Sequence, residues 1–302
     1  MIEFLVYLFT MAGIWGLMSL SLNLQYGLAG LVNLGHIVFF MLGAYVSTIL
    51  VVLFDAPILL GMLGGIAAAA LFGGLMALPT ARLQQDYWGI STLAIAEIVR
   101  MIFLNTPLGS PYVGRAFGVS GIPRPLRGLF DDSSAYNLFY LAIVIVCLAL
   151  TYLLVRWLAA TPFGRTLKAM REGDAVPQAL GKPVASFRLR AMMIGGGIGG
   201  LAGALFAHYN AYIGPEYFLP VETFIIWAMV ILGGAGNFTG ALVGTFIIMA
   251  IYNSTRFIAP WLHIDAQVLG PLRMIAIGVL IILVILFVPQ GLVSERRRRY
   301  DR

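Results

Sequence analysis

The sequence is poor in charged residues. Only 11% of its 302 residues are Asp, Glu, Lys or Arg, whereas 60% are hydrophobic, and the mean hydropathy is +0.93. A soluble domain carries about 25% charged residues, which it needs to cover its water-facing surface. This shortage excludes a soluble enzyme, a disordered chain and a nucleic-acid-binding module. It predicts an integral membrane protein with membrane lipid as its surroundings.

Cysteine and phosphate-binding motifs are also scarce. The single cysteine, Cys147, excludes a disulfide framework and a CxxC metal site. The three histidines are too far apart in sequence for metal-ligand spacing. No Walker A loop is found, because Gly181-Lys182 is followed by Pro183 and has Val176 where the first glycine belongs. We therefore expect no metal and no cofactor, and any ATP that drives this chain must bind to another subunit.

Apolar runs fill most of the chain. A hydrocarbon core of about 30 Å requires about 20 apolar residues per helix. On that measure we expect an all-α polytopic membrane protein of one domain over residues 1–302, with about nine spans and a range of eight to ten. The nine stretches are 4–24, 35–53, 58–81, 88–105, 136–157, 189–211, 219–235, 239–258 and 268–288. Glycine-rich flanks leave 35–53 and 219–235 open to being re-entrant or broken helices.

Positive charge is concentrated in two segments. Residues 156–190 carry seven Lys or Arg against two acidic residues, a balance of +5, and the tail 289–302 carries five against two, a balance of +3. Lys and Arg between membrane spans favour the cytoplasmic side. We therefore expect a cytoplasmic segment at 158–188, a cytoplasmic C-terminus, an external N-terminus and an external loop at 106–135. That loop is either functional or a passive connector.

Glycine clusters are the most frequent motif. Residues 195–200 satisfy the dinucleotide pattern GxGxxG, but they begin an apolar span and do not follow a strand. The spacing of Gly196 and Gly200 instead indicates close helix packing. Two further clusters, at 27–36 and 233–240, lie just before apolar spans. They indicate either interrupted helices that line a cavity or tight turns in which Asn33 and Asn237 cap a helix.

Ionisable residues inside the spans are few. Glu97 and Arg100 stand three residues apart, so they share one helix face and can pair. They line a polar pathway or, alternatively, fix the orientation of a helix end. Glu222 and Arg273 are expected near the interfaces, and His36 is more often a hydrogen-bonded structural residue. This sparsity argues against a proton or sodium relay.

The segment 161–190 carries a short apolar face, Leu167 and Met170, among charged residues. A compact charged helix between two spans suits docking on a cytoplasmic partner. The alternative is a solvated loop.

Several of these pieces together resemble the permease subunits of branched-chain amino acid ABC transporters, and in particular the longer of the two permease paralogues. The matching pieces are 22–27 (LNLQYG), 33–36 (NLGH), 43–45 (GAY), 87–89 (YWG), 92–94 (TLA), 96–100 (AEIVR), 161–165 (TPFGR), 179–181 (ALG), 200–204 (GLAGA) and 232–237 (LGGAGN). They run in family order over nearly the whole chain. Pro177-Gln178 and Pro183 depart from the family pattern.

The resemblance implies a permease subunit, not an enzyme, in a bacterial or archaeal cytoplasmic (inner) membrane. Its implied partners are a second homologous permease, two cytoplasmic ATPase subunits and an external substrate-binding protein. The implied cargo is a branched-chain or other hydrophobic amino acid, or a related solute such as urea, an amide or an organic acid. An ion-coupled secondary transporter is the alternative, and an intramembrane enzyme is a weaker one.

Two sets of residues are candidates for these roles. The candidates for the translocation pathway are Asn33, His36, Tyr45, Tyr87, Thr92, Glu97 and Asn237. The candidates for coupling to an ATPase are Gly164, Arg165, Leu167, Met170, Arg171, Glu172, Leu180 and Gly181.

Overall fold

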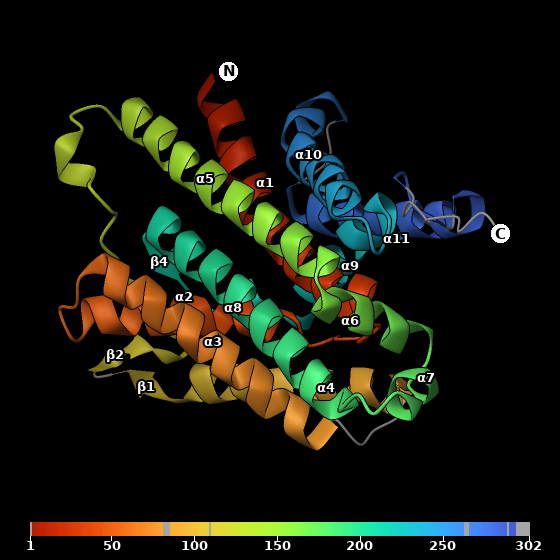
Figure 1. Ribbon diagram of the computed structural model, residues 1–302. Helices are drawn as coiled ribbons and strands as arrows, with labels where there is room; N and C mark the ends of the chain where they lie inside the picture. Colours follow the sequence, from red (N-terminus) through yellow and green to blue (C-terminus); the bar gives the residue numbers. More distant parts are fainter. Residues whose placement is uncertain (1, 81–84, 109, 263–265, 289, 294–302) are drawn as a thin grey trace.

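The computed structural model describes all residues except 1, 81–84, 109, 263–265, 289 and 294–302, and it is mainly helical (Figure 1). The helices are α1 (Ile2–Leu22) with its π-helical continuation η1 (Asn23–Leu28), α2 (Ile37–Val52), α3 (Ile58–Thr80), α4 (Gln85–Asn105), α5 (Ser133–Ala160), α6 (Pro162–Glu172), α7 (Ala175–Ala179), α8 (Val184–Asn210), α9 (Pro220–Gly233), α10 (Phe238–Leu262) and α11 (Ala266–Phe287). The prediction of an all-α membrane protein is confirmed.

The predicted number of spans is not confirmed. Five helices are long and apolar enough to cross a membrane, namely 2–28, 58–79, 87–105, 133–160 and 184–210. The stretches 37–52, 220–233, 238–253 and 270–284 are shorter apolar helices. With 16 and 14 residues, α2 and α9 are only about 24 and 21 Å long at 1.5 Å per residue, less than a bilayer core of about 30 Å. Each of the nine predicted stretches nevertheless coincides with an apolar helix.

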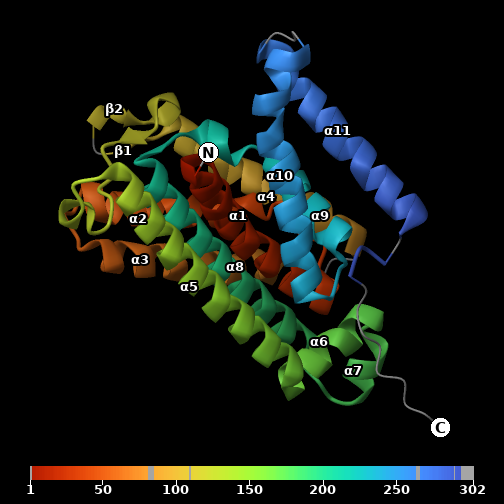
Figure 2. The ribbon, with the colours of Figure 1, turned by 90° about the horizontal axis from the view of Figure 1, so that it is seen from above.

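The innermost helices are α1 and α8, each of which has 72% of its most apolar stretch buried. Seen from above, α1 lies between α8 and α10 (Figure 2). The closest packing joins α2, α3 and α8, and glycine makes it possible. A Cβ on Gly200 or Gly203 of α8 would overlap α3 or the Phe40 carbonyl of α2, and a Cβ on Gly43 would overlap Gly200. The close-packing interpretation of the glycine run is therefore correct, and residues 195–200 lie buried inside α8.

The expected external loop is folded. It contains strands β1 (Pro107–Leu108), β2 (Ser110–Gly114) and β3 (Val119–Ser120) and the 3-10 turns η2 (Arg115–Phe117) and η3 (Arg127–Leu129). Strand β3 pairs antiparallel with β4 (Tyr212–Ile213), which precedes the turn η4 (Pro215–Phe218). The loop is thus attached to the connection between α8 and α9.

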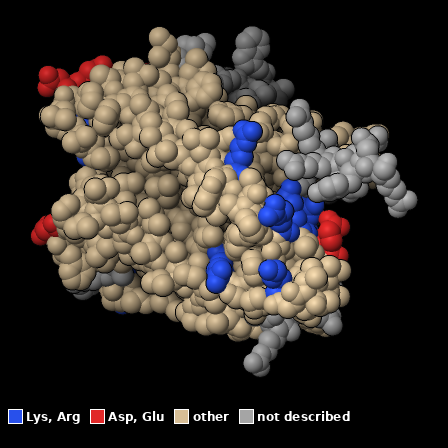
Figure 3. All heavy atoms as spheres, viewed as in Figure 1, with Lys and Arg blue, Asp and Glu red and all other residues tan. Residues whose placement is uncertain are grey.

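Lys and Arg are not spread evenly between the two ends of the molecule (Figure 3). At one end, called here the N-terminal end, the Ser134 hydroxyl donates to the Glu3 carboxylate at 2.6 Å, which brings the start of α5 to the start of α1. At the other, called the α6 end, Leu292 and Val293 bond to the last turn of α9 beside α6. Lys and Arg gather at the α6 end on the face shown in Figure 3. The segment 156–190 and the described start of the tail therefore share one end. Residues 294–302 of the predicted cytoplasmic tail lie outside the described residues.

Candidate functional site

The chain leaves the helical conformation between η1 and α2, inside the molecule. Residues 29–36 form no regular helix, yet the side chains of Asn33 and His36 are completely buried. Gly35 lies so close to α4 that a Cβ there would overlap the Thr92 carbonyl. Backbone can be irregular at membrane depth only where protein or a water-filled cavity surrounds it. The first glycine-rich cluster is thus an interrupted helix that the rest of the chain covers.

Side chains form a polar network at this interruption. The Asn33 amide donates to the Gln25 side-chain oxygen at 2.9 Å, and His36 Nδ1 lies 3.2 Å from the same oxygen. The Gly35 N–H donates to the Asn33 side-chain oxygen at 3.0 Å, which closes a local turn. Asn33 and His36 are therefore held in a closed, protein-lined environment. His36 is hydrogen-bonded, as expected of a structural residue, whereas Asn33 does not cap α2, which begins after His36 without a side-chain cap.

Neighbouring helices supply hydrogen-bond partners for the backbone groups that the interruption leaves without a helical partner. The Leu34 N–H donates to the Thr92 hydroxyl of α4 at 3.1 Å, and the Ile37 N–H donates to the Thr223 hydroxyl of α9 at 3.2 Å. The Trp227 indole N–H donates to the Asn33 carbonyl at 3.0 Å. Because an unpaired backbone group costs free energy in an apolar interior, these bonds stabilise the break. Thr92 is thus a buried structural partner in this conformation.

The second glycine-rich cluster packs directly against the first. The Gly236 N–H donates to the Asn23 side-chain oxygen at 2.8 Å, and a Cβ on Gly27 would overlap the backbone of Gly236. Asn237 caps α10, since its side-chain oxygen accepts from Thr239 N at 3.0 Å and Gly240 N at 3.1 Å. The cap interpretation of Asn237 is correct.

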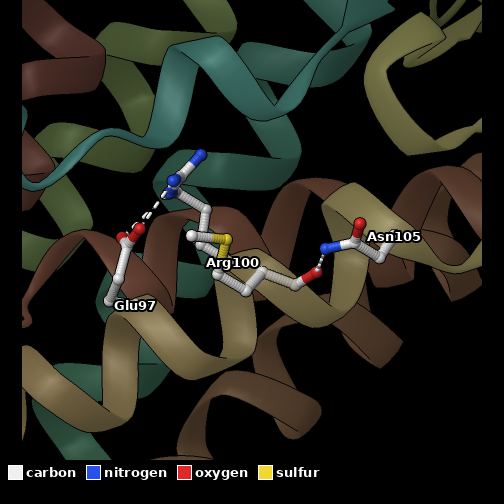
Figure 4. A network of polar contacts seen from close by, with 4 residues as sticks. Glu97, Arg100 and Asn105 are labelled. Carbon is white, nitrogen blue, oxygen red and sulfur yellow. Dashed lines mark hydrogen bonds and ion pairs between the residues drawn. The ribbon is translucent and has the colours of Figure 1, made fainter.

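Glu97 and Arg100 form a two-pronged ion pair near the middle of α4. Arg100 Nε donates to one Glu97 carboxylate oxygen at 2.8 Å, and Arg100 Nη2 donates to the other at 2.5 Å. Figure 4 shows both side chains pointing toward each other from the same side of α4. The arginine is 13% exposed and the glutamate 32% exposed, beside Ile98, which is 60% exposed. Charged groups at membrane depth almost always face protein or water, so this face of α4 is unsuited to lipid.

The remaining pathway candidates are divided between two environments. Tyr45 is completely buried, and its ring is tilted against those of Phe103 and Phe218, with centroids 4.5 and 5.6 Å away. Tyr87 is 60% exposed and shares α4 with Glu97. The structure therefore brings Asn33, His36 and Thr92 together and leaves Tyr87 and Glu97 on the α4 surface. Asn237 lies apart from both groups, at the α6 end.

The coupling candidates also divide, and here the structure corrects an expectation. Leu167 is 0% exposed and Met170 3%, and both pack into the core of this chain, so their apolar face is not available to a partner. Gly164 is buried because α6 turns back tightly on the end of α5. The side chains directed outward are those of Arg165, Glu172 and Leu180, together with the exposed Gly181. An amphipathic helix buries its apolar stripe against whatever lies nearest, which here is its own membrane domain.

Two arginines hold residues 162–179, called here the α6–α7 segment, against the long apolar helices. The guanidinium of Arg171 donates to the Gly27 carbonyl at the helix interruption. Arg188 pairs with Asp174 at 2.5 Å and lies 5.7 Å above the Trp88 ring of α4. A movement of α6 and α7 is thereby linked to both η1 and α4.

No motif in the sequence indicates the cavity that lies near the N-terminal end. Its lining comes from α1, α2, η4 and α9, from the C-terminal end of α8 and from the middle of α10, and includes Trp15, Asn210, Glu222 and Asn253. These residues are far apart in sequence and share no spacing, so only the folded chain brings them together. Among the described residues, no group of three or more His, Cys, Asp or Glu is placed to hold a metal ion.

These features define a polytopic α-helical membrane protein with an interrupted helix and a compact helical segment at one end, a form suited to a transport permease. A family profile described as "Branched-chain amino acid transport system / permease component" matches residues 4–285. The chain belongs to this family.

Three relatives illustrate the similarity. The chain is 31% identical over 233 residues to the high-affinity branched-chain amino acid transport system permease protein LivM of Salmonella typhimurium, covering 69% of this chain and 53% of that protein. The Escherichia coli protein of the same name is also 31% identical, with the same coverage. The chain thus spans about half the length of these two relatives. A probable branched-chain amino acid transport permease protein LivM of Methanocaldococcus jannaschii is 29% identical, covering 94% of this chain and 91% of that protein. No solved structure matches significantly.

Proposed function

We propose that this chain is the membrane-spanning permease subunit of an ATP-driven importer of branched-chain or other hydrophobic amino acids. The observation that carries the proposal is the family match over residues 4–285, nearly the whole chain. The permease names of the three relatives support the amino-acid cargo. A related small solute, such as urea, an amide or an organic acid, is a cargo that the uptake assay below distinguishes.

The proposed complex contains four kinds of subunit. Since the sequence has no phosphate-binding loop, two ATPase subunits supply the energy from the α6 end, which is the cytoplasmic side of a bacterial or archaeal inner membrane. A substrate-binding protein docks on the folded segment 106–135 at the external side. A second homologous permease packs beside this chain. This subunit itself moves solute and performs no chemical reaction.

The face of α4 is the proposed contact with the second permease. It combines the Glu97–Arg100 pair with exposed Tyr87, Ile98 and Ile102, and lipid would solvate the pair poorly. A second permease would cover this face, and solute would pass along the boundary between the two subunits. Glu97 then lines the path, whereas Asn33, His36 and Thr92 hold the interrupted helix behind it.

The proposed coupling element is the outward surface of the α6–α7 segment. Val176 is 65% exposed and Leu180 72%, flanked by Arg165, Glu172 and Lys182. Exposed apolar side chains in a charged rim are typical of a docking patch. Movement of this patch by an ATPase would reach η1 through Arg171 and α4 through Arg188, as described above.

Coupling is tested by Leu180→Ala, with Lys182→Ala as a control in the same segment. Truncating an apolar anchor at an interface costs about 2 kcal/mol or more, whereas a rim charge costs less. We expect Leu180→Ala to weaken co-purification of the ATPase subunits and to reduce substrate-stimulated ATP hydrolysis, while Lys182→Ala stays near wild type. If Leu180→Ala keeps wild-type co-purification and wild-type ATP hydrolysis, the ATPase subunits do not dock on this patch.

The transport activity is tested with the complete complex in proteoliposomes. Uptake of radiolabelled L-leucine is measured with and without ATP, in the presence of the binding protein, and in competition with L-valine, urea, acetamide and benzoate. We expect uptake that requires ATP and is inhibited by L-valine. Uptake that follows a proton or sodium gradient without ATP would refute the proposal in favour of an ion-coupled transporter.

A further inference from the structure

The outer face of the helix bundle carries an apolar groove of about 380 Å³, with α3 and α5 as its walls and α8, the most buried of the three, as its floor. Figure 1 shows α8 running between α5 and α3. Of the nine residues that line the groove, eight are apolar and one, Thr151, is polar but uncharged. Because all three helices are long and apolar enough to cross a membrane, the groove faces the hydrocarbon of the bilayer.

Two small residues keep the groove open. A Cβ on Gly197 of α8 would lie 3.5 Å from the Ala70 Cβ and 3.7 Å from Ile66 Cγ2 of α3, which is ordinary van der Waals contact. The neighbouring glycines differ, since a Cβ on Gly196 or Gly200 would come within 2.5 or 2.7 Å of α3. Helix packing therefore requires glycine at 196 and 200 but not at 197, where the missing side chain leaves space in the groove.

The groove is long and narrow. Its floor runs from Met193 to Leu201, a rise of about 12 Å at 1.5 Å per residue. A volume of about 380 Å³ over that length gives a mean cross-section of about 32 Å². An α-helix with its side chains is about 10–12 Å across, or about 80–110 Å² in section. The groove is thus too narrow for a helix of another protein and has a width suited to an extended alkyl chain.

Positive charge lies where the groove approaches the α6 end. Arg190 is exposed and lies one turn before Met193 on the same face of α8. Its guanidinium lies 5.9 Å from the ring centroid of Phe187, so the side chain is directed toward the α6 end. Among the described residues, no carboxylate forms an ion pair with Arg190. On α5, Trp157 lies one turn beyond Leu154 of the lining and is 63% exposed.

The groove and this charged end match the two parts of a phospholipid. Long cationic side chains near helix ends and Trp rings lie at the level of lipid headgroups. The Lys and Arg residues visible in Figure 3 gather at the same end of the molecule. Basic sites between membrane helices on the cytoplasmic side bind anionic headgroups, because a guanidinium forms charge-assisted hydrogen bonds to phosphate oxygens.

We propose that the groove holds one acyl chain of an anionic phospholipid, whose phosphate is bound by Arg190. The alkyl chain packs against the α8 floor at Gly197, and the glycerol region lies beside Trp157. A lipid with net negative charge is favoured over phosphatidylcholine, whose choline group brings a second positive charge near Arg190. The inference needs only a membrane-spanning chain and holds whatever solute the complex carries.

The first test measures lipid binding to the delipidated full chain by native mass spectrometry. The probes are phosphatidylglycerol and phosphatidylcholine with the same palmitoyl and oleoyl chains. We expect the first phosphatidylglycerol to bind about fivefold more tightly than the first phosphatidylcholine, equivalent to about 1 kcal/mol. Arg190→Gln should reduce this preference to less than about twofold.

The matched control is Arg156→Gln, which should retain the preference for phosphatidylglycerol. Arg156 is also an exposed arginine at the α6 end, but it lines a different cavity, beside the start of α10. Equal binding of the two lipids to the wild-type chain, or an unchanged preference in Arg190→Gln, would overturn the proposal.

Gly197→Leu tests the groove itself, because the leucine side chain would fill the space beside Ala70. We expect it to weaken binding of the first lipid of either kind about fivefold. The control is Gly278→Leu in α11, where a Cβ would have no described neighbour within 4 Å, and we expect binding within about twofold of wild type. Wild-type affinity in Gly197→Leu would contradict a site in this groove.

A third measurement uses the wild-type chain and applies even if a variant does not fold. Phosphatidylglycerol with a diazirine on one acyl chain is incorporated into nanodiscs and photolysed, and the adducts are located by peptide mass spectrometry. We expect adducts on residues 66–70, 151–154 and 193–201 to exceed those on α11 about fivefold, both in the isolated chain and in the complete complex. Uniform labelling of all apolar helices would mean ordinary solvation by lipid and would overturn the proposal. Labelling of the groove that is lost in the complete complex would also overturn it, since a protein subunit would then cover the groove.

Discussion

The Glu97–Arg100 pair makes the sharpest prediction about stability. Glu97→Gln removes the carboxylate and leaves the arginine charge on the middle of α4. Two unit charges about 4 Å apart attract by about 4 kcal/mol at an effective dielectric constant of 20. Removing one partner of a buried pair costs about 3–5 kcal/mol. Since the two side chains are 13% and 32% exposed, we expect the lower end of this range, about 3 kcal/mol for either single variant.

The double variant distinguishes the loss of the ion pair from the cost of leaving one charge without a partner. Glu97→Leu with Arg100→Leu leaves no stranded charge, so we expect it to cost less than either single variant. Glu172→Gln is the control, because the Glu172 carboxylate is 77% exposed and lies 3.4 Å from Arg171. An exposed pair of this kind contributes about 0–1 kcal/mol.

The assay is reversible unfolding of the full chain in detergent micelles, followed by helical circular dichroism, alongside ATP-dependent uptake by the complete complex. The pairing argument is refuted if the double variant is destabilised by the sum of the two single variants. It is also refuted if Glu97→Gln is as stable as wild type and yet abolishes uptake. The carboxylate would then act on the solute and not on its neighbour.

Two further outcomes follow from the packing, and a third follows from the distribution of charge. Gly203→Ala should destabilise the chain by about 1–3 kcal/mol in the same unfolding assay, because its Cβ would overlap the backbone of α2, whereas Gly197→Ala, with 3.5 Å to the nearest atom, should be close to neutral. Thr92→Val should cost about 1–3 kcal/mol by leaving a buried backbone N–H unpaired, and Thr92→Ser should restore most of it. In a cysteine-free background, an impermeant maleimide should label Ser133→Cys but not Gln178→Cys in intact cells, and the reverse pattern would contradict the proposed orientation.

Much of the fold was predictable from sequence because lipid imposes simple rules. A bilayer requires runs of apolar residues of a set length, so each predicted stretch coincides with an apolar helix. Small residues at every fourth position favour close helix contacts, and the α2, α3 and α8 glycines make them. The pairing of Glu97 with Arg100 also followed from spacing alone, since residues three apart on a helix are neighbours.

Spacing along one segment could not reveal which surface that segment faces. Leu167 and Met170 form an apolar stripe in the sequence, but only the position of α6 against α5, α8 and η1 decides that the stripe is buried within the chain. The meeting of Gly27 with Gly236 likewise joins residues distant in sequence.

Composition and local periodicity are enough to place this chain in a membrane, to locate each apolar helix to within a few residues and to show which segments carry positive charge. The tertiary structure alone decided that α2 and α9 are too short to span a bilayer core, that Asn33 and His36 are enclosed, and that Trp15, Glu222 and Asn253 share one cavity. The physical reason is that burial and cavity lining depend on contacts between helices, and the order of residues within a single helix does not specify its neighbours.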